Sequence, residues 1–248
     1  MTSEFLLFLL IGAALGGFVS GLAGFGTALF ALGWWLQIMP ASEAVALCLV
    51  VSMLSGSPGL VMVRNSIDWR ALNRFLIPAV FGIPLGLVLL EYVSSHMLMW
   101  VIAVFMLVYG IYFGLRKNLP KISGPWITID ICIGFTSGVL GALAGLSGAL
   151  PTMWLSLRRW PKLRVRGILQ PFNMIVLLVS AAGLFIQGAY TTHVLRTIVV
   201  AMPATICGAM LGIWVFGKMD DSLFQRTLIA LMALSGFLLM MRLLLSPN

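Results

Sequence analysis

The chain has 248 residues, of which 61% are hydrophobic and only 9% are charged, with a mean hydropathy of +1.09. A soluble domain carries about 25% charged residues, so this composition excludes a soluble globular protein. The net charge of +8 would suggest nucleic-acid binding in a soluble protein. In a membrane protein basic residues first report topology, and we predict no nucleic-acid partner.

Apolar segments recur along the whole chain. After a first run over 5–39, they cover 44–63, 75–90, 97–115, 168–187, 197–217 and 227–245. These later segments are each near the ~20 residues that cross a hydrocarbon core of ~30 Å. The first residues carry no positive charge, so we expect the N-terminal segment to be retained rather than cleaved as a signal peptide. The sequence therefore predicts an all-α polytopic membrane protein.

The two halves of the sequence overlay. A shift of 121 residues places Gly17 on Gly138, Leu22-Ala23-Gly24 on Leu143-Ala144-Gly145, and Pro40 on Pro161. Many secondary transporters are built from such internal repeats. We predict a first transmembrane repeat at residues 1–118 and a second at 124–248, joined by an inter-repeat loop at 116–124.

The first run, 5–39, would be a helix ~52 Å long, which is too long for one crossing. It is either one broken span or a re-entrant hairpin that turns near Gly24. If both glycine segments are single spans, the basic residues divide evenly between the two sides. If both are hairpins, only Arg196 and Arg242 lie apart from the other basic residues, so the positive-inside rule favours hairpins. Removing the cluster Arg158–Arg166 leaves this preference unchanged.

We therefore predict eight helical hydrophobic segments in two inverted repeats. Each repeat has one re-entrant glycine hairpin and three full transmembrane helices. Both termini lie outside, and the basic loops lie in the cytoplasm. Lipid is one expected partner, and a homodimer is left open.

Two kinds of glycine occur in the hairpins. Ala13, Gly17 and Gly21 recur at four-residue spacing, as do Gly134, Gly138 and Ala142, and such small residues let membrane helices pack closely. The segments Gly24-Phe25-Gly26-Thr27 and Gly145-Leu146-Ser147-Gly148 instead lie where one half-helix must end and another begin. We expect Thr27 and Ser147 to cap the emerging helices, 27–39 and 148–158. Their free N–H groups and positive dipole ends would together form an anion site, the alternative being a purely structural kink.

Polar residues on a later segment could support this site. Arg166, Gln170 and Asn173 lie at i, i+4 and i+7, hence on one helix face. Ser52 is the repeat partner of Asn173, and Ser55 follows one turn later; helix–helix hydrogen bonding is the alternative for both. The basic cluster Arg158, Arg159, Lys162, Arg164 and Arg166 would either gather anions at an entrance or contact lipid headgroups.

Several kinds of chemistry are not expected. Asp130, near the start of its hairpin, is the carboxylate nearest to a span centre, which argues against a cation site. His96 and His193 fall in outer loops away from a nucleophile, and no metal or nucleotide motif occurs, so we expect neither an enzyme nor a cofactor or metal. The cysteines Cys48, Cys132 and Cys207 are interpreted as core thiols.

These motifs resemble the TauE/SafE sulfite exporter family, also called the toluene-sulfonate uptake permease family. The resemblance rests on the paired segments Gly24-Phe25-Gly26-Thr27-Ala28 and Gly145-Leu146-Ser147-Gly148-Ala149-Leu150-Pro151, on Ile67-Asp68-Trp69, and on the run from Arg158-Arg159-Trp160-Pro161-Lys162 to Gln170-Pro171-Phe172-Asn173. It implies an inner-membrane carrier of sulfur-containing anions. Thr27-Ala28 stands where the family commonly has a further glycine, and Phe30 or Ala31 where it has proline.

The sequence pattern predicts a secondary carrier with alternating access around an anion site near the membrane midplane, and the resemblance implies sulfite or organosulfonates as its substrates. The alternatives are a passive anion channel and a carrier of another small organic anion such as a carboxylate. Phe25 would narrow the site. The candidate substrate-binding residues are Gly24, Phe25, Gly26, Thr27, Ser52, Gly145, Ser147, Gly148, Arg166, Gln170 and Asn173.

Overall fold

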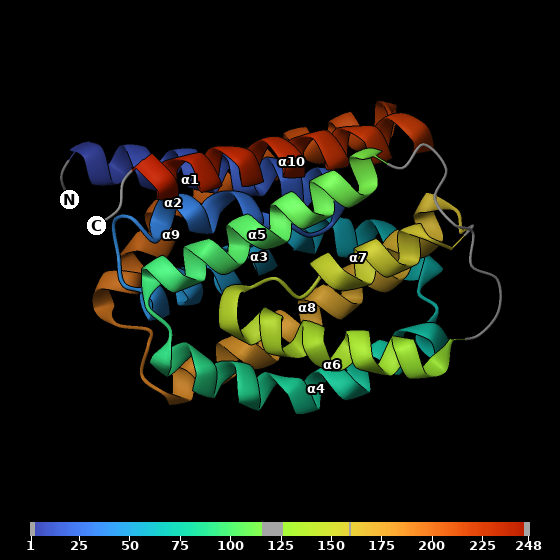
Figure 1. Ribbon diagram of the computed structural model, residues 1–248, viewed down its shortest axis with the longest axis horizontal. Helices are drawn as coiled ribbons and strands as arrows, with labels where there is room; N and C mark the ends of the chain where they lie inside the picture. Colours follow the sequence, from blue (N-terminus) through green and yellow to red (C-terminus); the bar gives the residue numbers. More distant parts are fainter. Residues whose placement is uncertain (1–2, 116–125, 159, 246–248) are drawn as a thin grey trace.

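The computed structural model describes residues 3–115, 126–158 and 160–245, and every regular element in these ranges is a helix (Figure 1). The first half contains α1 (Ser3–Ala23), the π-helix η1 (Ala28–Leu32), α2 (Gly33–Trp35), α3 (Ala41–Val63), the 3-10 turn η2 (Arg64–Ser66), α4 (Trp69–Tyr92) and α5 (Ser95–Leu115). The second half contains α6 (Ile127–Ala144), α7 (Ala149–Ser156), α8 (Lys162–Ile186), α9 (Thr192–Lys218) and α10 (Asp221–Leu245). The inter-repeat loop predicted at 116–124 lies outside the described residues.

Six helices in the described ranges are long and apolar enough to cross a membrane: α1, α3 extended by η2, α4, α6, α8 and α9. Each has 18 to 27 residues, which at 1.5 Å per residue gives ~27–40 Å. The predicted class, an all-helical multi-pass membrane protein, is confirmed.

Both glycine segments break the chain into a long arm and a short arm. Gly24 (φ 82°) and Gly26 (φ 103°) separate α1 from η1 and α2, and Gly145 (φ 67°) ends α6 before α7. A side chain rarely adopts these left-handed conformations, which explains glycine at the turns. Gly145 also closes α6, because its N–H donates to the carbonyl oxygen of Gly141 at 2.9 Å.

The arms differ from those predicted. The emerging helices are shorter than the expected 27–39 and 148–158, covering 28–35 and 149–156, because the chain already turns before the prolines at 40 and 161. In Figure 1, α1 enters from the end where both termini lie and α2 returns to it, whereas α6 and α7 open toward the opposite end.

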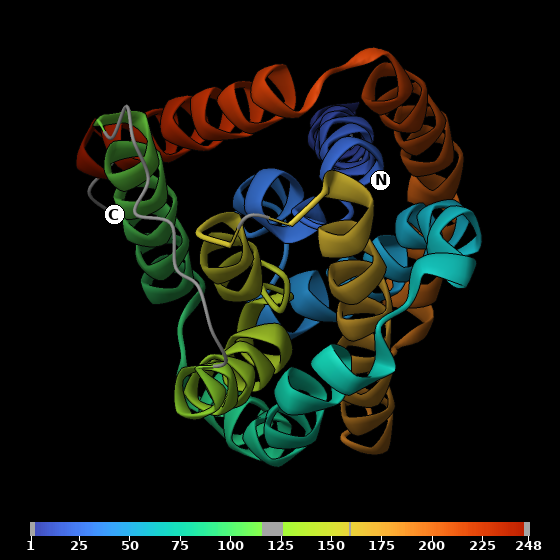
Figure 2. The same ribbon diagram turned by 90° about the vertical axis from the view of Figure 1, so that its right-hand side faces the viewer.

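The halves pack reciprocally. The first helix of each half lies against the third long helix of the other, α1 on α9 and α6 on α4. The remaining helices pair with their counterparts, α3 with α8 and α5 with α10. Figure 2 shows the short arms near the centre, with α4, α5, α9 and α10 around them.

Glycines allow the two closest of these pairings. A Cβ built on Gly17 or Gly21 would collide with the backbone carbonyls of Thr205 and Ala209 on α9. On the other side, Gly134 and Gly138 of α6 face the carbonyls of α4 in the same way. The predicted packing role of these small residues is confirmed. The interpretation of the cysteines as core thiols is confirmed for Cys48, which is buried. It is wrong for Cys132 and Cys207, which are exposed on faces of α6 and α9 that no described helix covers.

Candidate substrate-binding site

The tips of the two hairpins meet in the interior. A Cβ built on Gly148 would lie 2.5 Å from the Cβ of Phe25, so Phe25 packs directly on the second tip. A Cβ built on Gly145 would lie 3.2 Å from the Cβ of Ala28 and 3.3 Å from the Sγ of Cys48 on α3. The structure therefore brings together the glycine segments that lie about 120 residues apart in the sequence.

The hydroxyls of the tips do not cap the short helices, so this prediction is wrong. Thr27 precedes η1 without a side-chain capping bond, and its Oγ1 lies 3.3 Å from the Oγ of Ser55 on α3. Gly148, rather than Ser147, occupies the capping position of α7, and the Ser147 hydroxyl donates to the Oδ1 of Asn173 on α8. Each hydroxyl is buried and satisfied by a long helix of its own half, which fixes the tip to that helix.

Backbone donors are left over at both tips. Among the described residues, none accepts a hydrogen bond from the N–H groups of Gly26, Ser147 or Gly148. These donors lie at the start of α7 and just before η1, where helix dipoles are positive. Unpaired N–H groups in a buried, apolar setting favour a ligand that accepts hydrogen bonds.

Arg166 holds the carbonyl end of α1. Its Nη2 donates to the carbonyl oxygen of Gly21 at 2.8 Å, its Nη1 points to that of Leu22 at 3.4 Å, and its guanidinium lies 4.1 Å from the centre of the Phe216 ring. A cation at this position offsets the negative end of the helix dipole where α1 breaks off. The side chain is buried, so it belongs to the interior and not to an entrance.

Gln170 bridges the first tip and α3. Its Nε2 donates to the carbonyl oxygen of Gly56 at 2.7 Å, and a Cβ built on Gly24 would lie 2.5 Å from its Oε1. The predicted face of α8 is therefore divided between the tips. Arg166 and Gln170 face the first hairpin, and Asn173 bonds the second.

Ser52 does not bond either tip. Its hydroxyl lies 3.7 Å from the Sγ of Cys48, which in turn lies next to Gly145. Sequence reasoning missed Gly56, Gly59 and Ser20. A Cβ on Gly56 or Gly59 would press on Gln170, and Ser20 accepts from Ser55 at 2.9 Å. Gly56 and Gly59 belong to a glycine and proline cluster, 56–59, inside an apolar segment. Such a cluster indicates a close backbone approach and could have pointed to both glycines.

A buried ion pair fixes the second hairpin at its open end. Asp130 on α6 accepts from the indole Nε1 of Trp154 and from the Nη2 of Arg158, each at 2.6 Å. The Arg158 guanidinium also lies 5.2 Å from the centre of the Trp154 ring and 5.1 Å from that of Trp160. The proposed entrance role is thus not available to Arg158 in this conformation, because its side chain is 6% exposed. In the first hairpin, the indole Nε1 of Trp35 on the short arm donates to the Leu9 carbonyl oxygen on the long arm at 3.2 Å.

Other members of the basic cluster have different surroundings. Arg164 pairs with Asp68, the N-cap of α4, at 2.9 Å, and both side chains are partly exposed. The N–H of Ala71, followed by Arg164, holds the pKa of the Asp68 carboxyl below its usual range. Arg159 and the side chain of Lys162 lie outside the described parts of the structure.

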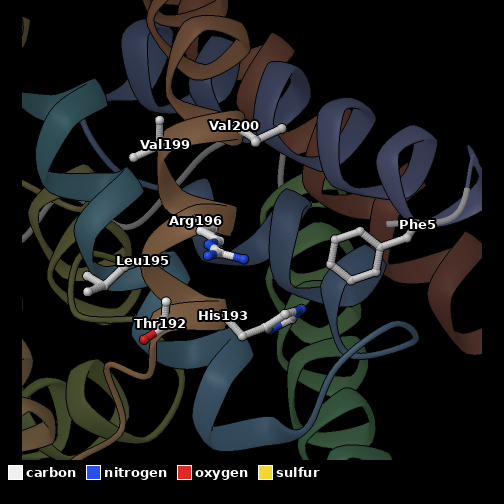
Figure 3. A pocket seen from close by; sticks show the side chains of 7 residues that line it. All are labelled: Phe5, Thr192, His193, Leu195, Arg196, Val199 and Val200. Atoms are coloured by element: carbon white, nitrogen blue, oxygen red, sulfur yellow. The ribbon is translucent and has the colours of Figure 1, made fainter.

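A separate hollow lies at the end that holds the termini (Figure 3). This pocket, of about 980 Å³, is lined by Phe5, Thr192, His193, Leu195, Arg196, Val199 and Val200. His193 lies 3.4 Å from the carboxylate of Glu43, and the ring of Phe5 meets its imidazole edge-on. Exposed Leu195 and Val199 are typical of a lipid-facing surface, and no predicted site residue lines this pocket.

Within the described residues, no group of three or more His, Cys, Asp or Glu side chains could hold a metal ion.

The comparison with protein families identifies the chain. A family model described as Sulfite exporter TauE/SafE matches residues 8–239. The chain belongs to the TauE/SafE family. No curated protein and no solved structure matches it. Membership assigns the chain to a family of membrane exporters of sulfite, and the predicted family resemblance is confirmed.

Proposed function

We propose that this TauE/SafE protein is a secondary carrier for small sulfur-containing anions, sulfite or organosulfonates, which bind where the two hairpin tips meet. The observation that carries the proposal is the contact of Phe25 with Gly148, because it brings the unpaired N–H groups of both tips into one buried region. An anion with several oxygens can accept from several such donors at once.

The electrostatics of this region favour an anion. Arg166 lies beside the first tip, and the short helices direct their positive ends toward the centre. The nearest carboxylate on the hairpins, Asp130, is engaged by Arg158 and Trp154. Asn173 adds a donor, because its Oδ1 already accepts from Ser147 and only its amide NH₂ is left for a ligand.

In this proposal, the inverted arrangement of the two halves provides alternating access. The reciprocal packing of α1 on α9 and of α6 on α4 supports inverted repeats, as do the hairpins that open toward opposite ends. One repeat would rock against the other around the tips. Residues 64–68, 157–158, 160–161 and 219–220 lie between helices at the end opposite the termini (Figure 1), which supports basic loops in the cytoplasm and both termini outside the inner membrane.

Counterflow in proteoliposomes tests this function. Vesicles loaded with unlabelled sulfite should accumulate radiolabelled sulfite transiently, and the rate should saturate. Asn173→Ala should abolish the accumulation, while Ser180→Ala, on the same helix but away from the tips, should retain it. A flux that neither saturates nor shows counterflow would indicate a channel. Exchange of a small carboxylate but not of sulfite or a sulfonate would contradict the assignment of sulfur anions.

A further inference from the structure

Two buried polar atoms beside Gly24 have no hydrogen-bond partner in the described part of the chain. They are the Nε of Arg166 and the Oε1 of Gln170. The two residues are only 3% and 1% exposed. Leaving such groups unpaired costs on the order of 1–3 kcal/mol each, so a donor and an acceptor left unpaired beside the same glycine favour a ligand there.

The orientation of both groups is fixed by their other contacts. The Nε2 of Gln170 donates to the Gly56 carbonyl oxygen at 2.7 Å, so the amide oxygen must be the atom that faces Gly24. The terminal nitrogens of Arg166 are directed to the carbonyls of Gly21 and Leu22. Of its three nitrogens, Nε is therefore the one without a hydrogen-bond partner in the described part of the chain.

Glycines let the backbone approach this pair closely. A Cβ built on Gly24 would lie 2.5 Å from the Oε1 of Gln170 and 3.6 Å from the Nε of Arg166. A Cβ built on Gly59 would lie 3.1 Å from the same Oε1. A donor and an acceptor therefore face the same glycine-lined region at the first hairpin tip.

We propose that Gln170 and Arg166 select the protonated form of the anion, hydrogensulfite, over fully ionised sulfite or sulfate. This inference rests on the proposed function and names its substrate class. The Nε–H of Arg166 donates to one ligand oxygen, and the ligand O–H donates to the Oε1 of Gln170. A sulfite or sulfate dianion has no proton for Oε1, and neither has a sulfonate, so an oxygen of each would face this second acceptor in a buried site. The selection therefore narrows the proposed substrates to hydrogensulfite.

Among the described residues, no hydrogen bond or ion pair joins Gln170 to an ionisable side chain. The elements packed on α8 and its flanks carry Glu43, Cys48, Arg64, Asp68, Arg70, Arg74, Glu91, Tyr92, Asp130, Cys132 and Arg158. Of the carboxylates, Asp130 pairs with Arg158, Asp68 with Arg164 and Glu43 with His193, and Glu91 accepts from Gln187. Arg166 is the charged side chain beside Gln170, and it keeps its charge throughout the neutral range.

Counterflow at equal pH on both sides of the vesicle membrane tests this selection without a proton gradient. Total sulfite is held constant below half-saturation while the pH is lowered through the range in which sulfite takes up its proton. The wild-type rate should rise in proportion to the hydrogensulfite fraction, with a preference of ~5-fold or more for that form, as expected for one hydrogen bond. Gln170→Leu should lose this preference, and Ser180→Ala should keep it.

The outcomes separate the two proposals. Saturable exchange with a rate that is constant or falls as the pH is lowered would overturn the selection and leave the carrier function standing. A rise that persists unchanged in Gln170→Leu would also overturn it, since another group would then be titrating. If that variant fails to fold, Gln170→Asn, which withdraws the amide by one methylene, takes its place. Absence of exchange at every pH would remove both proposals.

Discussion

Ser147, at the tip of the second hairpin, donates a hydrogen bond to Asn173 in the middle of α8. The first hairpin has a parallel contact, between Thr27 and Ser55 of α3. Each re-entrant tip is thus attached by a hydroxyl to a long helix of its own half. The attachment can move with that half as one body when the halves shift relative to each other.

A double-mutant cycle should detect the Ser147–Asn173 contact. We expect Ser147→Ala and Asn173→Ala to be coupled by ~0.5–1.5 kcal/mol in the free energy of unfolding, the usual range for a polar contact between membrane helices. Unfolding in mixed detergent micelles measures each single variant and the double variant. Strict additivity would show that the contact does not contribute to stability.

Gly24→Ala should impair both stability and transport. The residue has φ 82°, and the added Cβ would lie 2.5 Å from the Oε1 of Gln170. Gly188→Ala is the matched control, because Gly188 has φ 76° but nothing within 4 Å of an added Cβ. Both variants carry a left-handed strain of ~1–2 kcal/mol, so only the contact distinguishes them. Equal losses of melting temperature and of sulfite exchange would contradict the tight approach at Gly24.

The buried ion pair of Asp130 with Arg158 should contribute more to stability than the partly exposed pair of Asp68 with Arg164. Asp130→Asn leaves the buried cation of Arg158 without its carboxylate, and we expect a loss of ~3–5 kcal/mol in stability. Asp68→Asn breaks a pair whose side chains are partly exposed, for which salt bridges contribute ~1 kcal/mol or less. Chemical denaturation of both variants measures the difference. Comparable losses would argue against a buried role for Asp130.

The pH dependence of the Asp68 contribution has a definite sign. Because folding lowers the pKa of this carboxyl, its ionised form stabilises the protein fully above the ordinary aspartate pKa. The stabilisation is lost as the pH falls through the lowered value. The difference in melting temperature between wild type and Asp68→Asn should therefore be constant near neutrality and shrink in acid. A difference that grows on acidification would contradict this assignment.

The turns of the two hairpins could be predicted, because the glycines at Gly24 and Gly145 are a local sequence signal. The same signal occurs once in each half of the chain, which strengthened the prediction. The partners of the tips could not. Arg166 reaches the Gly21 carbonyl across 145 residues, and Gln170 reaches Gly56 across 114. Such contacts depend on how α8 lies against α1 and α3, which helical periodicity does not specify.

The capping prediction failed for the same reason. Serine and threonine before a helix usually bond its first N–H groups, and sequence alone offers no competing partner. Here Ser55 and Asn173 lie opposite the hydroxyls and bond them instead. The backbone N–H groups at the tips therefore stay unpaired in the described structure. The residues whose capping was predicted wrongly are thus the residues of the candidate site.

Equilibrium binding of radiolabelled sulfite to the purified protein tests the central claim most directly. The account predicts saturable binding to the wild type and to Ser180→Ala, and binding at least ~10-fold weaker in folded Asn173→Ala, as expected for one lost hydrogen bond to an anion. Binding that is undetectable in the wild type, or equally tight in Asn173→Ala, would contradict a sulfur-anion site at the hairpin tips.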